Sequence, residues 1–329
     1  MVTRWTSRLP LLLAAVTVLM TSPLFAVAAE DFPSRMMHIV VGGAAGTPPD
    51  TISRMIANEL AQVEGWRIIV ENKPGAMQTL GAADVLRQPA DGYTLLCVSL
   101  PAALAPLLLD TVSIRLDTDF RPLIKLATAY HVLVVNPSVP AKTLPELVAL
   151  LKKEPDKLTF SSGGFGTPAH VTGELFKLQT GVRATHVPYQ ALPQAIGDLL
   201  NGTNQFQFIT PLPVLDLIAA GKLRALAVAG PARSAVLKDV PTVGEAGFPE
   251  LISQDWIGLL VRRGTPDQVI DRLNQAINRA LGKPELRSAI AKLGAEAAGG
   301  SPAEFAEFLT GQMAYWAKVV KASGMKMHQ

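Results

Sequence analysis

The chain has 329 residues, a formal net charge of +3 and 49% hydrophobic residues, enough for two domains with large cores. It has no basic run and only 6% aromatic residues, which argues against nucleic-acid binding. The single cysteine, Cys97, excludes an intramolecular disulfide, and its apolar neighbours predict a buried side chain.

The first 29 residues are typical of an export signal. Arg4 and Arg8 precede an apolar run from Leu9 to Met20, and Ala26-Val27-Ala28 offers a small-x-small cleavage site. The run is shorter than the ~20 residues that a membrane span needs, so an uncleaved anchor is the weaker alternative. We therefore expect an exported, soluble mature protein that begins near residue 30.

A strand, a glycine turn and a helix are predicted at the start of the mature chain. HIVV at 38–41 suits a strand, GGAAG at 42–46 forms the turn, and a helix begins at Pro48. We expect the Thr47 hydroxyl to cap this helix by accepting a free backbone N–H of its first turn. Proline is favoured at the first helical position, because its missing N–H costs nothing there. The free N–H groups and the helix dipole there favour an anion. Asp50 would repel an anion, so it is expected to organise the loop.

The following segments alternate between strand and helix, which indicates an α/β fold. They are a strand at 67–70, a turn-rich loop at 71–76, a helix at 78–88 and an apolar strand at 93–98. The apolar strand is typical of a parallel sheet that is covered on both faces. Ser99 follows its carboxyl end, where open parallel sheets bind ligands, and is a candidate contact.

The segment 158–177, LTFSSGGFGTPAHVTGELFK, repeats the first strand-turn-helix unit. Gly166-Thr167-Pro168 mirrors Gly46-Thr47-Pro48, and Thr167 is again the expected cap. Two such units suggest two similar lobes whose helix N-termini hold one anion from both sides. His170 lies one turn into the second helix and is expected either to orient the loop or to contact the ligand.

The remaining segments complete two lobes. Extended runs at 120–136 and 255–261 are expected to cross between them. This makes the first lobe discontinuous, from 30–131 plus 254–329, around a second lobe at 132–253, and it permits hinge closure. The other predicted elements are helices at 144–153, 192–200, 266–281, 284–293 and 302–323 and strands that end near 190, 209 and 229.

Six segments together resemble the substrate-binding proteins of the tripartite tricarboxylate transporter type, the Bug or TctC-like family. They are ENKPGA (71–76), ADGYTLL (90–96), GELFK (173–177), HVPY (186–189), AGKLRALAV (220–228) and DVPTVGEAG (239–247). The resemblance implies a monomeric periplasmic protein with a type II Venus-flytrap fold and no catalysis, cofactor or metal. Its ligand would be a small carboxylate, and its partners would be membrane transporter subunits or a sensor kinase.

The resemblance also implies which residues bind the ligand. Carried over by position, they are Gly46, Thr47, Pro48, Asp50, Ser99, Ser162, Gly166, Thr167, His170, Tyr189, Gln190 and Thr210. Phe165 stands where the family commonly has asparagine, and Ile209-Thr210 stands where it often has Asp-Asn. These departures make the pocket less polar, so we expect an organic acid with an apolar or aromatic body.

An exported enzyme is the alternative interpretation. Glu71, at the end of the second predicted strand, imitates the acid of a dinucleotide-binding βαβ unit, but Val41 stands where the first glycine of the motif belongs. Nicotinamide cofactors are also scarce outside the cytosol. A hydrolase has less support, because the chain lacks G-x-S-x-G and its five histidines lack the H-E-x-x-H spacing.

Overall fold

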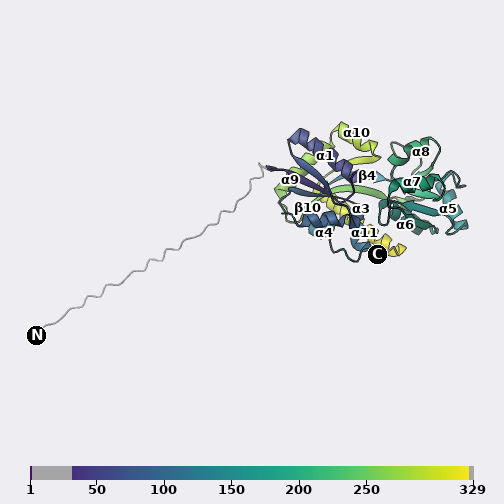
Figure 1. Ribbon diagram of the computed structural model, residues 1–329, viewed down its shortest axis with the longest axis horizontal. Helices are drawn as coiled ribbons and strands as arrows, with labels where there is room; N and C mark the ends of the chain where they lie inside the picture. Colours follow the sequence, from purple (N-terminus) through teal and green to yellow (C-terminus); the bar gives the residue numbers. More distant parts are fainter. Residues whose placement is uncertain (2–31, 326–329) are drawn as a thin grey trace.

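The computed structural model describes residue 1 and residues 32–325 (Figure 1). The expected export signal and its cleavage site therefore lie outside the described residues. Two β-sheets form two lobes side by side, and helices cover both faces of each sheet (Figure 1). None of the helices in the described part of the chain combines the length and the apolar character that a membrane span requires.

The first sheet has six strands in the order β11-β4-β10-β3-β1-β2. β1 is parallel to β2 and β3, whereas β10 and β11 pair antiparallel with their neighbours. The strands are β1 (Met37–Val41), β2 (Ile68–Asn72), β3 (Thr94–Ser99), β4 (Phe120–Tyr130), β10 (Gln254–Arg262) and β11 (Ala295–Gly299). Residues 95–98 are fully buried, as expected for a strand covered on both faces, and Cys97 is among them.

The second sheet has five strands in the order β7-β6-β8-β5-β9. β6 is parallel to β7 and β8, and β5 is antiparallel to β8 and β9. The strands are β5 (Val132–Val135), β6 (Thr159–Ser162), β7 (Thr185–Pro188), β8 (Phe206–Ile209) and β9 (Arg224–Val228). The carboxyl ends of β6 and β8 carry the loops that face the first lobe.

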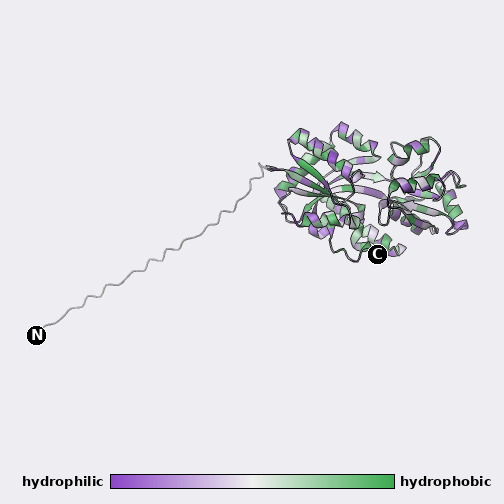
Figure 2. Ribbon diagram, in the orientation of Figure 1, coloured by the Kyte–Doolittle hydropathy of each residue, from purple (hydrophilic) through white to green (hydrophobic). Residues whose placement is uncertain are grey.

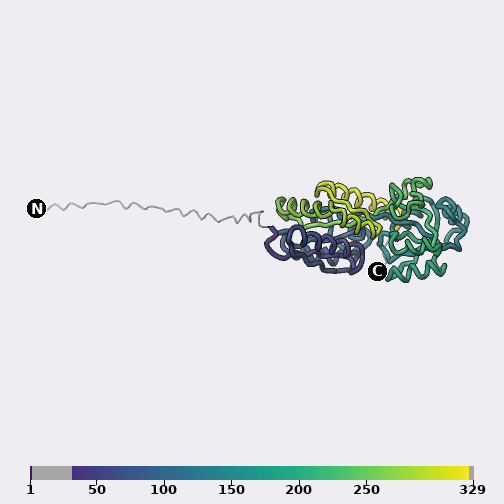
Figure 3. Tube along the Cα trace, turned by 90° about the horizontal axis from the view of Figure 1, so that it is seen from above, coloured from purple at the N-terminus to yellow at the C-terminus, as the bar shows by residue number. Residues whose placement is uncertain are grey.

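The chain crosses between the two sheets twice, as the sequence predicts. It leaves the first sheet after Tyr130, enters the second at Val132, and returns between Val228 and Gln254. In Figure 3 the purple N-terminal and yellow C-terminal segments lie together in one lobe, and the teal and green middle segment forms the other. The predicted residue boundaries of the lobes stay a prediction.

The helices surround both sheets. In the first lobe they are α1 (Pro48–Glu64), α2 (Thr79–Leu86), α3 (Leu100–Leu108), α4 (Leu116–Asp119), α9 (Asp267–Leu281), α10 (Pro284–Lys292) and α11 (Pro302–Ser323). In the second lobe they are α5 (Leu144–Lys153), α6 (Pro168–Thr180), α7 (Leu192–Leu200) and α8 (Leu215–Ala219). Short 3₁₀ turns are η2 (Ala76–Gln78), η3 (Leu212–Val214) and η4 (Pro249–Leu251).

One hydrophobic cluster continues from lobe to lobe. It joins α3 and α11 of the first lobe to α6 of the second. α11 starts against the first sheet, where Phe305 packs on Trp256, and its C-terminal part packs beside α6. The strands are largely hydrophobic in Figure 2, while the helices carry both hydrophobic and hydrophilic residues. Because α11 packs on both lobes, it forms a third connection between them, besides the two crossings.

Candidate functional site

Asp50 holds the first loop, residues 42–47, which joins β1 to α1. Its buried carboxylate accepts hydrogen bonds from the Gly46 N–H and the Arg54 Nε, both at 2.9 Å. Burial alone would raise the pKa of this carboxyl, but hydrogen bonds from Arg54, Gly46 and Asn72 outweigh it and hold the pKa below its ordinary value. Asp50 is therefore charged, and it organises the loop as expected.

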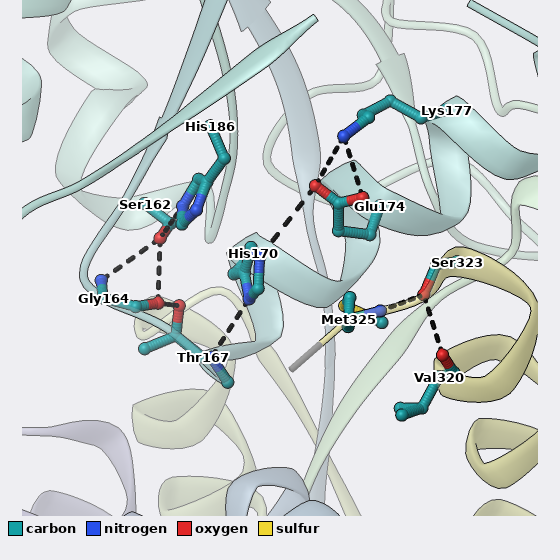
Figure 4. A network of polar contacts seen from close by, with 11 residues as sticks. Ser162, Gly164, Thr167, His170, Glu174, Lys177, His186, Val320, Ser323 and Met325 are labelled. Atoms are coloured by element: carbon teal, nitrogen blue, oxygen red, sulfur yellow. Dashed lines mark hydrogen bonds and ion pairs between the residues drawn. The ribbon is translucent and has the colours of Figure 1, made fainter. Parts of the chain in front are cut away.

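His170 has the same role in the second loop, residues 163–167, which joins β6 to α6. Its Nδ1 accepts a hydrogen bond from the Gly166 N–H at 3.1 Å, four residues away, the same spacing as in the first loop (Figure 4). Gly46 and Gly166 both have left-handed φ angles, 79° and 70°. Burial lowers the pKa of His170 to about 4, and the charge of Lys177 acts in the same direction. The imidazole is therefore neutral and able to accept this bond.

Thr47 and Thr167 do not cap their helices through their side chains, so this prediction was wrong. Each hydroxyl instead donates to the carbonyl oxygen three residues earlier, Ala44 O at 2.6 Å and Gly164 O at 2.7 Å. A threonine hydroxyl can close its own turn in this way when the carbonyl lies within reach. The two threonines therefore tighten the loops rather than the helices.

Several backbone N–H groups of the two loops have no hydrogen-bond partner within residues 32–325. They belong to Gly43, Ala44 and Ala45 in the first loop and to Gly163 and Phe165 in the second, and the first turn of α6 adds Ala169 and His170. Prolines at 48 and 49 leave the first turn of α1 with few donors. The donors for an anion therefore come mainly from the loop in the first lobe, and from the loop and the helix start in the second.

Besides the packing of α11 beside α6, the lobes approach each other at Gly166 and at Gly294. A Cβ added to Gly166 would overlap the Cε of Met77 and would lie 3.0 Å from its Sδ. A Cβ added to Gly294, the residue before β11, would lie 3.2 Å from the Cδ of Pro211 in the second lobe. The second loop is thus held close to the first lobe, in contact with Met77.

Three of the predicted site residues have side chains that support the loops from inside the protein. Ser99 and Ser162 are buried, and their hydroxyls bind the Gln78 amide and the His186 Nε2, both at 2.7 Å. Tyr189 is buried, donates its hydroxyl proton to Asp198 at 2.6 Å and accepts a hydrogen bond from Asn204.

The other predicted residues have side chains that are free to meet a ligand. Gln190 and Pro48 are exposed and Thr210 is half-buried, and their side chains form no hydrogen bond with any described residue. The ligand contacts of all twelve residues stay a prediction.

Sequence analysis missed an aromatic cluster beneath the second loop. The His186 and His170 rings stack with their centroids 4.1 Å apart, and the Phe165 ring meets each of them edge-on at 5.2 Å. Burial lowers the pKa of His186 to about 3, and the charge of Lys177, together with that of His170 once it is protonated, acts in the same direction. Phe165 is 46% exposed, so this cluster presents an apolar ring beside the free N–H groups of the loop. His186 lies in the HVPY segment, but no local sequence pattern predicts its ring contacts with His170 and Phe165.

Asp255 occupies the N-terminus of a third helix. It lies at the start of β10, and its carboxylate accepts hydrogen bonds from the Trp256 N–H at 2.9 Å and from the Leu100 N–H at the start of α3. Burial raises the pKa of this carboxyl to about 7. The protein's own carboxyl group therefore fills this helix end.

The features that imitate an enzyme have structural explanations. Glu71 does lie in the second strand of a βαβ unit, but its carboxylate binds the Nδ1 of His38 at 2.6 Å. Within the part of the chain that the structure describes, no group of three or more His, Cys, Asp or Glu side chains is arranged to hold a metal ion.

Comparisons with known proteins connect this geometry to one family. A family model described as "Tripartite tricarboxylate transporter family receptor" matches residues 52–325. Protein BugT of Bordetella pertussis is 32% identical over 303 residues, which cover 92% of this chain and 93% of that protein. The solved structure "R. palustris Rpa4515 with adipate" is 30% identical with a TM-score of 0.80, and the match covers 90% of this chain and 100% of that one. "MatC (Rpa3494) from Rhodopseudomonas palustris with bound malate" is 31% identical with a TM-score of 0.76, covering 88% and 100%.

Proposed function

The chain belongs to the tripartite tricarboxylate transporter receptor family, and from this premise we propose that it captures a small carboxylate between its two lobes. The observation that carries the proposal is the pair of loops on opposite lobes, each with free backbone N–H groups and each braced by one side chain, Asp50 or His170. Backbone N–H donors and a helix N-terminus can bind a carboxylate without the help of a positively charged side chain. The solved relatives that hold adipate and malate support this ligand class.

The energetics favour capture by closure over capture by either lobe alone. One helix N-terminus contributes about 0.3–2 kcal/mol, whereas micromolar binding needs about 8 kcal/mol. Donors from both loops, together with the release of water between them, are needed to make up the difference. The ligand body should be largely apolar, because Phe165 and Met77 lie beside the loops.

Location and partners follow from the family. We infer that residues 1–29 direct the chain to the periplasm and are then removed. The mature protein acts as a monomer that binds without turnover and delivers its ligand to the membrane subunits of a tripartite tricarboxylate-type transporter. Delivery to a sensor kinase is the second candidate, and an assay of uptake in a strain that lacks the membrane subunits separates the two.

A thermal-shift screen of the mature protein tests the proposed ligand class. The panel contains aliphatic dicarboxylates, tricarboxylates, aromatic acids, amino acids and nicotinamide nucleotides. At 100 times Kd a ligand stabilises the folded state by about 2.7 kcal/mol, which raises Tm by several degrees. We expect one class of carboxylates to raise Tm, with no chemical change in the recovered ligand. A shift with a nicotinamide nucleotide alone, or turnover of the acid, would overturn the proposal.

A further inference from the structure

A short left-handed segment stands between the two ligand-binding loops. Ala76, Met77 and Gln78 have φ angles of 44°, 53° and 74°, although none of them is glycine. Each such residue costs roughly 1–3 kcal/mol and persists only where its surroundings fix it. One of these constraints is the Thr79 hydroxyl, which donates to the Ala76 carbonyl at 2.7 Å. The surroundings therefore hold the side chains of this segment in fixed positions.

Gln78 joins this segment to the first lobe. Its Nε2 donates to the Ser99 Oγ at 2.7 Å, and its Oε1 accepts from the Ser99 N–H at 2.9 Å. Its Cβ also packs against the first loop so closely that a Cβ on Gly42 would lie 2.5 Å away. Gln78 thus fixes the segment to the first loop and to the carboxyl end of β3.

Met77 carries the same segment across to the second lobe. Its thioether lies directly against Gly166, whose N–H is the one that His170 holds. Leu108 of α3 approaches the same glycine, so the contact is apolar on both sides. Two consecutive residues, Met77 and Gln78, therefore touch both anion-binding loops.

We propose that Met77 is a specificity-determining residue that forms an apolar side wall of the closed cleft and sets how closely the two loops approach. The inference rests on the proposed function, because it places the ligand between these loops. A thioether packs well against an aliphatic or aromatic body, whereas a hydroxyl or ammonium group placed there would lose its water without gaining a partner. Met77 therefore favours acids whose carbon chain is unsubstituted beside the carboxylate.

The first test measures affinity for two acids by calorimetry in wild type, Met77→Ala, Met77→Gln and the control Met55→Ala. Met55 is also half-buried, but it packs in the first lobe alone. Adipate has an unsubstituted chain and malate carries a hydroxyl group. We expect Met77→Ala to weaken adipate about tenfold and malate less than twofold, and Met77→Gln to shift the preference toward malate. An equal loss for both acids, or no loss for either, would overturn the proposal.

The second test needs no ligand, so it separates failure of this inference from failure of the proposed function. A Gly166→Ala change places a Cβ against Met77, and it should lower Tm less in a Met77→Ala background than in wild type. The strain of alanine in a left-handed conformation is the same in both backgrounds and cancels. Equal decreases in Tm would show that Met77 does not contact the second loop and would overturn the proposal. If Gly166→Ala lowers Tm less in the Met77→Ala background but wild type binds no carboxylate, the contact is present and the proposed function fails. The claim about specificity then fails with it.

Discussion

Replacing His170 tests the idea that one side chain prepares each loop for its ligand. His170→Leu removes the acceptor of the Gly166 N–H, and Gly166 is buried. A buried donor without a partner costs about 1–3 kcal/mol. If the loop opens to satisfy this donor and must close again on binding, the cost appears as a loss of ligand affinity of about 5- to 150-fold.

His170→Asn is the matched control, because its Oδ1 can take the place of the Nδ1. Asp50 already performs this function with an oxygen acceptor at the same spacing in the first lobe. Both variants lose the stacking contact with His186, so the difference between them isolates the hydrogen bond. We expect calorimetry at pH 7.5 to give near wild-type affinity for Asn and weak binding for Leu.

Wild type and His170→Asn should also differ in how their ligand affinity depends on pH. A protonated His170 cannot accept the Gly166 N–H, and its pKa is about 4. Affinity in wild type should therefore fall as the pH is lowered toward 4 by more than in His170→Asn, where the acceptor does not titrate in this way. Equal affinities of the Leu variant and wild type, or an Asn variant as weak as Leu, would refute the reasoning.

Three further predictions concern the supports of the loops and the folded state. Asp50→Ala should lower the free energy of unfolding in urea by about 1–3 kcal/mol, since Gly46 and Arg54 lose a charged acceptor, and an unchanged value would contradict this. Tyr189→Phe should cost a similar amount by leaving Asn204 without its acceptor, while ligand affinity changes less than twofold; a large loss of affinity would instead make Tyr189 a ligand contact. Tm should fall between pH 6.5 and 4, because the pKa values of His131, His170 and His186 are lowered in the folded state to about 4, 4 and 3. The unfolded chain therefore takes up protons at these histidines at a higher pH than the folded protein does. Asp255, with its pKa raised to about 7, stabilises the folded state as the pH falls, but it is one group against three histidines. A Tm that stays constant between pH 6.5 and 4 would show that the histidines do not control stability in this pH range.

Sequence analysis predicted those elements whose signals are local. α5 and α7 have the predicted bounds, Leu144–Lys153 and Leu192–Leu200. Both begin at a leucine followed by proline, and Thr143 does cap α5 by accepting the Glu146 N–H. α3 was missed because LPAALAPLL is apolar on every face and contains Pro106, so it shows no helical period.

The candidate site was predictable only in part. The Gly-Thr-Pro repeats locate both loops, because glycine and proline mark turns and helix starts. The contacts that join the loops do not follow from local sequence. Met77 and Gly166 lie far apart in the chain, and nothing in Ala-Met-Gln predicts three consecutive left-handed residues. His170 and His186 likewise meet only because β6 and β7 are neighbours in the sheet.

The most direct test of the central claim is a two-dimensional NMR titration of ¹⁵N-labelled mature protein with the carboxylate that the thermal screen selects. The account predicts that amide resonances from residues 43–45 of the first loop and from residues 163–170, which span the second loop and the start of α6, shift together and saturate with one Kd. The account predicts this result because the ligand meets N–H groups from both lobes at once. Shifts that saturate in one loop while the other remains unchanged would contradict capture between the lobes.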